Sequence, residues 1–181
     1  MPIRPWTISH DSLWVTTRIF TLNKLHSTSA TGDKSGDFVY LNVPNWVNII
    51  ALTPSKEVVL VRQYRHGSRQ VTLEIPGGMC DADEDFISAA ARELLEETGY
   101  SGDPGALIGV VDPNPAFQNN RCATVLFTNV RQVSVQDLDP HEEIEIDTAP
   151  LSDIKRMIHD GEITHSLVVA AFYHYFMRDD S

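Results

Sequence analysis

The chain has 181 residues and a net charge of −11, with only 14 lysine and arginine residues. No cluster of basic residues is visible, which argues against a nucleic-acid backbone as the main partner. Apolar residues make up 42% of the sequence, enough for the core of one domain or of a domain with an appendage.

The two cysteines, Cys80 and Cys122, are too few for a disulfide framework and favour a reducing compartment. No secretory signal is visible at the start, and no apolar run approaches the length of a membrane span. We therefore expect a cytoplasmic protein with no membrane partner.

The first half of the chain is expected to form strands. Short runs rich in β-branched and aromatic residues are separated by polar turn segments, including 27–36 and 53–56. The runs expected as strands are 13–15, 18–22, 38–43, 46–52, 57–64 and 71–75.

A helix is expected from 83 to 98, because acidic residues near its start suit the positive end of the helix dipole and Gly99 is a natural stop. Its apolar stripe is expected to consist of Ile87, Ala91, Leu94 and Leu95, roughly opposite the glutamates. Further strands are expected at 107–111 and 122–128, and further helices at 151–160 and 164–177.

Strands on both sides of a central helix, with helices at the end, predict an α/β/α sandwich around a mixed central sheet. We see no internal repeat and no low-complexity tract.

The predicted central helix is unusually acidic. Glu93, Glu96 and Glu97 fall at positions i, i+3 and i+4, so they lie on one side of the helix. Like charges at this spacing destabilise an isolated helix by roughly a few tenths of a kcal/mol per pair. A hard divalent cation, which prefers carboxylate oxygens, would offset the repulsion.

This segment resembles the Nudix box, G-x5-E-x7-R-E-U-x-E-E-x-G-U, where U is aliphatic or aromatic. Only the last position departs from the usual pattern, with a tyrosine in place of an aliphatic residue. An ordinary solvated acidic helix surface is the alternative interpretation. The matching residues are Gly78, Glu84, Arg92, Glu93, Leu94, Glu96, Glu97, Gly99 and Tyr100.

The resemblance implies the Nudix fold, which is such a sandwich, and a metal site of one to three ions. It implies Glu93, Glu96, Glu97 and the backbone carbonyl of Gly77 as ligands of Mg²⁺, with Mn²⁺ as the alternative. It also implies an ion pair between Arg92 and Glu84 that orients the loop, against the alternative of a solvated helix charge on Arg92.

The N-terminal strands exceed what a catalytic core needs and look like the extra β-segment of the ADP-ribose pyrophosphatase branch. We therefore expect an N-terminal β-segment at 1–45 and a Nudix hydrolase domain at 46–181. In that branch the extra segment helps form a dimer, so a homodimer is expected.

Two elements before the box, 62–65 and 74–78, look like the Q-Y-R and E-x-P-A-G elements of nucleoside-diphosphate-sugar hydrolases. They suggest Arg65 as a bidentate contact to pyrophosphate. Arg62 is either a second substrate contact or a surface residue. Glu74 is expected to orient the metal site or the substrate, or else to face water at a strand end.

Pro115 lies 16 residues after Gly99, an offset that resembles a marker of ADP-ribose pyrophosphatases. The usual Ser-Pro-Gly start and nearby glutamate are missing here, which leaves the sugar nucleotide open. Trp46 is a candidate for stacking on the base, with core packing as the alternative. Trp14, Phe20 and Tyr40 are further candidates of the same kind.

The resemblance places the general base in a loop before the penultimate helix, here the acidic run 139–146. Glu142 fits best by its distance to Pro150, Glu143 is second, and Glu145 and His141 are further candidates. The alternative is a solvated loop without a catalytic residue.

Together these features predict metal-dependent hydrolysis of ADP-ribose or another nucleoside diphosphate sugar to a nucleoside monophosphate and a sugar phosphate. Two alternatives stay open. One is a hydrolase of nucleoside triphosphates or dinucleoside polyphosphates, and the other is a module that senses ADP-ribose without cleaving it.

Overall fold

The computed structural model describes residues 2–178, which divide into two compact units. The first unit comprises residues 2–44 with Asp112–Arg121, and the second comprises Asn45–Val111 with residues 122–178. Within residues 2–178, no helix has both the length and the apolar character needed to cross a membrane.

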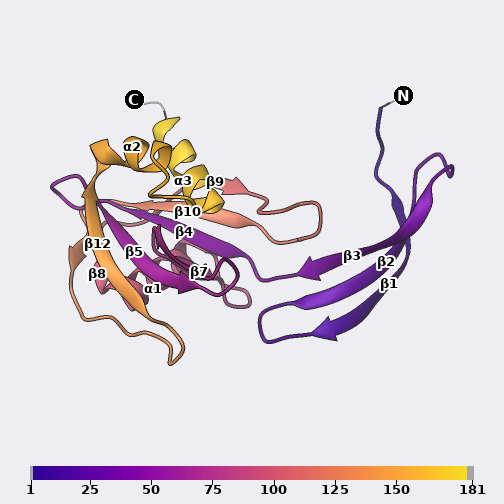
Figure 1. Ribbon diagram of the computed structural model, residues 1–181, viewed down its shortest axis with the longest axis horizontal. Helices are drawn as coiled ribbons and strands as arrows, with labels where there is room; N and C mark the ends of the chain where they lie inside the picture. The colour runs from indigo at the N-terminus through magenta and orange to yellow at the C-terminus, as the bar shows by residue number, and fades with distance from the viewer. Residues whose placement is uncertain (1, 179–181) are drawn as a thin grey trace. The chain divides into compact units, whose positions relative to one another are not determined.

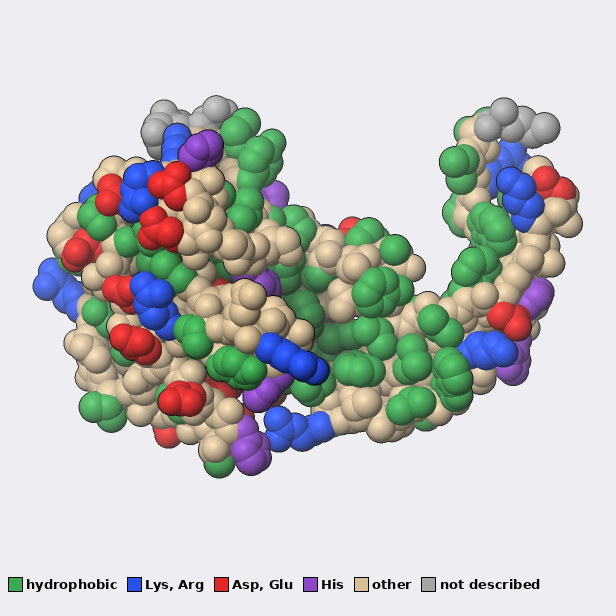
Figure 2. All heavy atoms as spheres, viewed as in Figure 1, with side chains coloured by type: hydrophobic (Ala, Val, Ile, Leu, Met, Phe, Trp, Pro, Cys, Tyr) green, Lys and Arg blue, Asp and Glu red, His purple; other side chains and the backbone are tan. Residues whose placement is uncertain are grey.

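The first unit is built on an antiparallel sheet of three strands in the order β1-β2-β3. Large apolar side chains of β1 face solvent, among them Ile8, Leu13 and Trp14, which are 56%, 61% and 63% exposed. Figure 2 shows hydrophobic side chains along this sheet. The strands are β1 (Thr7–Thr16), β2 (Thr21–Thr28) and β3 (Ser35–Asn42).

The strand expected at 18–22 is wrong over its first residues. The Thr17 hydroxyl donates to the Phe20 carbonyl at 2.7 Å and accepts from the amides of Ile19 and Phe20. A local side-chain bond of this kind competes with the sheet, so these residues form the turn between β1 and β2 despite their β-propensity.

The second unit contains a mixed sheet in the order β7-β4-β10-β9, in which β4 and β10 run parallel. A second, antiparallel sheet has the order β12-β5-β6, and β8 pairs with β11. The strands are β4 (Trp46–Ala51), β5 (Glu57–Arg65), β6 (Gln70–Glu74), β7 (Gly77–Met79), β8 (Tyr100–Ser101), β9 (Ala106–Val111), β10 (Cys122–Phe127), β11 (Arg131–Gln132) and β12 (Ile144–Pro150).

Helices cover both faces of the mixed sheet (Figure 1). Alternate residues of β4 serve the two sides: Val47 and Ile49 pack with α1, whereas Ile50 packs with α2 and α3. The predicted α/β/α sandwich is therefore confirmed. The helices are α1 (Phe86–Thr98), η1 (Leu151–Asp153), α2 (Ile154–His159) and α3 (Ser166–Phe176).

Helix α1 begins later than expected. Asp83 has a left-handed φ of 65°, and the Asp85 carboxylate caps the helix by accepting from the amides of Ile87 and Ser88. Gly99, with φ 70°, ends the helix as predicted.

The predicted apolar stripe of α1 is wrong for three of its four residues. Ile87 and Leu95 are 40% and 41% exposed, and Ala91 is also exposed. The helix instead buries Ala89, Ala90, Leu94, Glu97 and Thr98. The small alanines let the helix approach the sheet closely, and this turns Glu97 inward.

Candidate functional site

Arg92 is the centre of the largest side-chain cluster on α1. Its Nε and Nη2 donate to the two carboxylate oxygens of Glu84 at 3.1 and 2.9 Å, and Nη2 also donates to the Met79 carbonyl at 3.0 Å. Its Nη1 donates to Glu93 at 2.9 Å and to Glu96 at 3.0 Å. The hydrogen bonds that Arg92 donates to these glutamates, the ones to Glu84 first, raise the pKa of Arg92. The geometry thus contains the Arg92–Glu84 pair expected from the box.

Glu97 lies inside the unit, 4% exposed, where its carboxylate accepts from the Gly77 amide at 3.0 Å. Burial, together with the negative charges of Glu93 and Glu142, raises the pKa of Glu97 to about 8 although the Gly77 bond lowers it. A buried carboxylate of this kind is costly to ionise unless a positive charge comes near.

Glu93 fits beside Gly78, where a side chain on the glycine would lie 2.3–2.5 Å from the Glu93 carboxyl atoms. Glycine at this position therefore makes room for the carboxylate. Burial raises the pKa of Glu93, and the charges of Glu96 and Glu142 act in the same direction, although Arg92 opposes them.

Of the loop glutamates, Glu142 is the one whose charge acts on both Glu93 and Glu97. Its carboxylate accepts from the Asp139 amide at 3.2 Å, and its amide donates to the Asp139 carbonyl at 2.9 Å, which forms a tight turn. Glu143 and His141 are exposed. Glu145 is exposed on β12, opposite Arg62 on β5.

The loop before β12 is tied to the end of α1. Gln136 Nε2 donates to the carbonyl of Glu97 at 2.7 Å and to that of Ile144 at 3.1 Å. The Asp137 amide donates to the Glu96 carbonyl at 2.9 Å. Gln136 was not expected among the site residues, because no local sequence pattern distinguishes it.

Arg65 and Glu74 form a bidentate pair on β5 and β6. Arg65 Nε and Nη2 donate to the two Glu74 oxygens at 2.8 and 2.6 Å, and the Thr72 hydroxyl donates to Glu74 at 2.6 Å. Glu74 is 2% exposed, so the alternative in which it faces water at a strand end is wrong. Burial opposes its ionisation, but the bonds from Arg65 and Thr72 lower its pKa.

The remaining candidates have other partners. Arg62 Nη2 binds Asp147 at 2.9 Å, in a pair whose side chains are 42% and 40% exposed. Trp46 is half-buried at the start of β4, beside Met79 of β7. Pro115 is exposed in a turn of the first unit, where the amide of Phe117 donates to the Asn114 carbonyl at 3.1 Å.

The other aromatic candidates also belong to the first unit. Trp14 is largely exposed, Phe20 is half-buried, and the Tyr40 hydroxyl donates to Asp11 at 2.9 Å.

A family model described as NUDIX domain matches residues 44–172 of this chain. The chain belongs to the Nudix family. An ADP-ribose pyrophosphatase from Mycobacterium tuberculosis (strain ATCC 25618 / H37Rv) is 31% identical over 127 residues, covering 68% of this chain and 61% of the relative. An ADP-ribose pyrophosphatase from Saccharomyces cerevisiae (strain ATCC 204508 / S288c) is 38% identical over 94 residues, covering 49% of this chain and 41% of the relative.

The chain therefore spans less than two thirds of the length of both Nudix relatives. A solved structure entitled "Crystal structure of ADP compounds hydrolase" superposes with a TM-score of 0.82 at 20% identity, covering 97% of this chain and 95% of that one. At this identity the likeness supports the Nudix fold. The resemblance to the Nudix family, drawn from the box residues, is confirmed.

Nudix hydrolases generally use divalent metal cations, and the donors of this chain fit such an ion. The carboxylates of Glu93, Glu96 and Glu97 are the oxygen ligands that Mg²⁺ and Mn²⁺ prefer, and Glu93 and Glu97 have raised pKa values that a cation would relieve. As the side chains lie, no three acidic, histidine or cysteine groups among residues 2–178 converge closely enough to hold a metal. Arg92 and the Gly77 amide hold these carboxylates instead.

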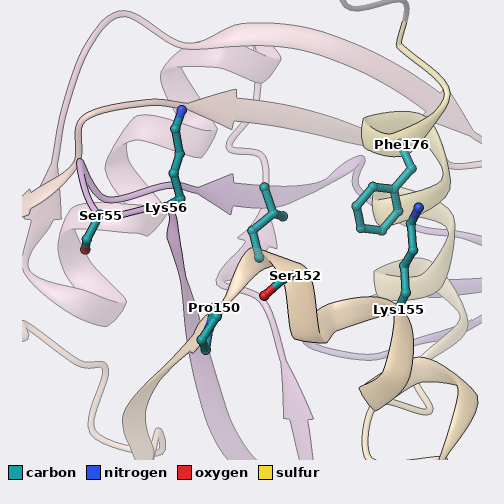
Figure 3. A pocket seen from close by; sticks show the side chains of 7 residues that line it. Ser55, Lys56, Pro150, Ser152, Lys155 and Phe176 are labelled. Atoms are coloured by element: carbon teal, nitrogen blue, oxygen red, sulfur yellow. The ribbon is translucent and has the colours of Figure 1, made fainter.

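Two other features of the Nudix unit contain none of the predicted site residues. The thiols of Cys80 and Cys122 are buried, and burial raises their pKa values to about 11 and about 12, which leaves them unreactive. A surface hollow of about 440 Å³ lies between the β4–β5 turn and α3 (Figure 3). Its lining consists of Ser55, Lys56, Pro150, Leu151, Ser152, Lys155 and Phe176.

Proposed function

We propose that this chain is a Nudix pyrophosphatase that hydrolyses the diphosphate linkage of ADP-ribose or another nucleoside diphosphate sugar. The products are a nucleoside monophosphate and a sugar phosphate. The observation that carries the proposal is the buried, charge-crowded Glu97 within the reach of Glu93 and Glu142. Similarity to two proteins called ADP-ribose pyrophosphatase supports the substrate class.

The metal site of this proposal consists of Glu93, Glu96, Glu97 and the Gly77 carbonyl. Mg²⁺ is the proposed ion, with Mn²⁺ as the alternative. A bound divalent cation would neutralise the diphosphate charge and polarise its oxygens. Glu97 is the expected central ligand, because a nearby cation would favour ionisation of this buried carboxyl group at neutral pH.

The general base of the proposal is Glu142. Its carboxylate would take a proton from water while the water oxygen bonds to phosphorus and the bridging P–O bond breaks. Glu143 serves as the matched control, since it is adjacent in sequence and exposed.

Arg65 is the proposed pyrophosphate contact. Its Nε and Nη2 donate to Glu74, so we assign the contact with the pyrophosphate to Nη1. Glu74 thereby acts as a positioning residue for Arg65. Roles for Arg62, Pro115 and Trp46 in substrate binding stay predictions, as does the boundary between an N-terminal β-segment at 1–45 and a Nudix domain at 46–181.

A kinetic panel tests the activity directly. ADP-ribose, GDP-mannose, UDP-glucose, NADH and nucleoside triphosphates would be incubated with Mg²⁺, and the products identified by mass. We expect a nucleoside diphosphate sugar to be preferred, with activity lost in EDTA and reduced at least about 1,000-fold by Glu97→Gln. Full activity of a folded Glu97→Gln protein would contradict the metal assignment.

The same panel separates the alternative functions. Preference for triphosphates would favour a hydrolase of nucleoside triphosphates or dinucleoside polyphosphates. Saturable ADP-ribose binding without turnover would favour a sensor. For the base, Glu142→Gln is expected to lower kcat about 100-fold, whereas Glu143→Gln should leave it within a factor of about two.

A homodimer completes the proposal. Exposed Leu13 and Trp14 on β1 supply apolar surface that a second copy would cover. Sedimentation should give a mass near twice 20.2 kDa for the natural chain, and a mass near 20.2 kDa for Trp14→Glu. A natural chain that sediments at 20.2 kDa at micromolar concentration would exclude this dimer.

A further inference from the structure

Arg92 uses all five of its guanidinium N–H donors, and they divide into two groups. Nε and Nη2 make three bonds, to Glu84 and to the Met79 carbonyl. Nη1 makes the other two, one to Glu93 and one to Glu96. One half of the guanidinium therefore holds the loop before α1, and the other half holds two acidic side chains of α1.

We propose that Arg92 competes with the divalent cation for Glu93 and Glu96, and so sets how tightly the chain binds the ion. The inference rests on the proposed function, in which these two glutamates are metal ligands. It goes beyond the Arg92–Glu84 pair, because it assigns to Nη1 of the same side chain a role that opposes ion binding.

The competition follows from the positions of the oxygens. Oε1 of Glu93 and Oε2 of Glu96 both lie within 3.0 Å of the same nitrogen, Nη1. A Mg²⁺ ion bonds carboxylate oxygens at about 2.0–2.1 Å, so an ion on these two oxygens would take the place of Nη1. An ion on the remaining oxygens would lie close to the positive guanidinium and would be repelled. In both cases the Nη1 contacts weaken ion binding.

The two glutamates differ in how easily they can exchange partners. Glu96 is 43% exposed at its side chain, so it can leave Nη1 and turn through solvent. Glu93 is 14% exposed and lies in the space beside Gly78. The anchor on Glu84, 17% exposed, keeps Arg92 in place while this happens. We therefore expect Glu96 to exchange first and Arg92 to remain paired with Glu84.

Binding linkage makes the effect measurable. If the Nη1 bonds and the ion exclude each other, removal of Arg92 must tighten ion binding by the factor that the bonds contributed. Two charge-assisted hydrogen bonds in a partly exposed site correspond to a gain of about fivefold to thirtyfold.

The test is a Mn²⁺ titration of the full chain, followed by the electron paramagnetic resonance of free Mn²⁺. Arg92→Gln is compared with Arg156→Gln, a matched change of charge in an exposed arginine that also pairs with two carboxylates, Asp160 and Glu162. We expect at least fivefold tighter binding for Arg92→Gln and less than a twofold change for Arg156→Gln. Equal or weaker binding by Arg92→Gln would overturn the proposal.

Glu97→Gln distinguishes this proposal from the proposed function. If the natural chain has no Mn²⁺ site that Glu97→Gln weakens, the metal assignment itself fails. If that site exists and Arg92→Gln does not gain affinity over Arg156→Gln, only the competition fails.

A measurement on the natural chain covers the case in which Arg92→Gln does not fold. The arginine side-chain signals in ¹⁵N nuclear magnetic resonance report whether each guanidinium N–H is hydrogen-bonded. On addition of Mg²⁺, the Arg92 Nη1 protons should exchange faster with water while the Nε proton stays protected. Unchanged Nη1 protection at saturating Mg²⁺ would contradict the competition.

Discussion

Glu74 and Glu97 are both almost completely buried, 2% and 4% exposed, yet the pKa values of their carboxyl groups shift in opposite directions. Glu74 receives three side-chain hydrogen bonds, two from Arg65 and one from Thr72, and its pKa falls. Glu97 receives one backbone bond, from Gly77, and its pKa rises to about 8.

Burial alone therefore does not decide the charge of a carboxyl group in this protein. Burial opposes ionisation at both positions, and the partner decides the outcome. Glu74 has its cation within the chain, in Arg65. Glu97 has Glu93 and Glu142 as charged neighbours, so the cation that balances it is expected from outside.

Among the substitutions considered, Glu97→Gln should change the stability most, because it removes the unbalanced charge of Glu97. Its pKa in the folded state lies above the ordinary value of 4.5, so its contribution to stability is complete below pH 4.5 and is lost as pH rises through about 8. In EDTA, Glu97→Gln should therefore stabilise the fold at pH 8.5. The upper limit is about 5 kcal/mol, since one pKa unit corresponds to about 1.4 kcal/mol.

Urea unfolding between pH 4.5 and pH 8.5 measures this effect. The natural chain should lose stability across this range relative to Glu97→Gln, and added Mg²⁺ should reduce the difference. Parallel pH curves for the two proteins in EDTA would contradict the raised pKa.

The next largest change in stability is expected from Arg65→Ala, which would leave Glu74 buried without a nearby cation, as Glu97 is. Arg65→Ala leaves the Glu74 carboxylate buried with only the Thr72 bond, and we expect a loss of about 3 kcal/mol at pH 7. The loss should shrink in the double variant Arg65→Ala with Glu74→Gln, because the uncompensated charge is gone. Denaturant titration of the three proteins gives these values, and a loss in Arg65→Ala below about 1 kcal/mol would count against the pair.

A smaller effect is expected from Thr72→Val, which keeps the shape of the side chain and removes one of three donors to Glu74. A hydrogen bond to a charged group contributes about 1.5 kcal/mol or somewhat more, so stability should fall by that amount. The decrease should diminish as pH falls through the Glu74 titration, and a decrease that does not depend on pH would point to packing instead.

The smallest effect is expected at the exposed pair of Arg62 and Asp147. Both side chains are about 40% exposed, and such surface pairs contribute about 1 kcal/mol or less. Arg62→Ala should therefore change the midpoint of urea unfolding little, in contrast to Arg65→Ala three residues away. A large loss of ADP-ribose hydrolysis with unchanged stability would restore Arg62 as a substrate contact.

The parts of the fold that the sequence predicted depend on short-range spacing. The spacing of the residues from Gly78 to Tyr100 predicts a loop, a helix and the end of that helix. The expected Arg92–Glu84 pair is also present. The strands β4 and β5 also match, since their apolar runs are continuous and bounded by a turn.

Longer-range contacts explain the errors. The buried side of α1 depends on which sheet it meets, so the wrong side was expected to carry the apolar stripe, with Ile87 and Leu95 inward. The pairing with β5 makes a strand of β12, whose first residues belong to the acidic run that was expected to form a loop. The register places Glu74 opposite Val61 and Arg65 opposite Gln70, so neither the pairing of Arg65 with Glu74 nor the bonds of Gln136 follow from the sequence pattern.

Gln136 has a consequence for how precisely the site can work. One amide nitrogen holds both the last turn of α1 and the first residue of β12, and the segment between them carries Glu142. We therefore expect a displacement at the end of α1 to move the segment that carries Glu142, so that the distance between Glu97 and Glu142 varies less than the position of either residue. In mechanical terms, the amide removes a degree of freedom that a free loop would have.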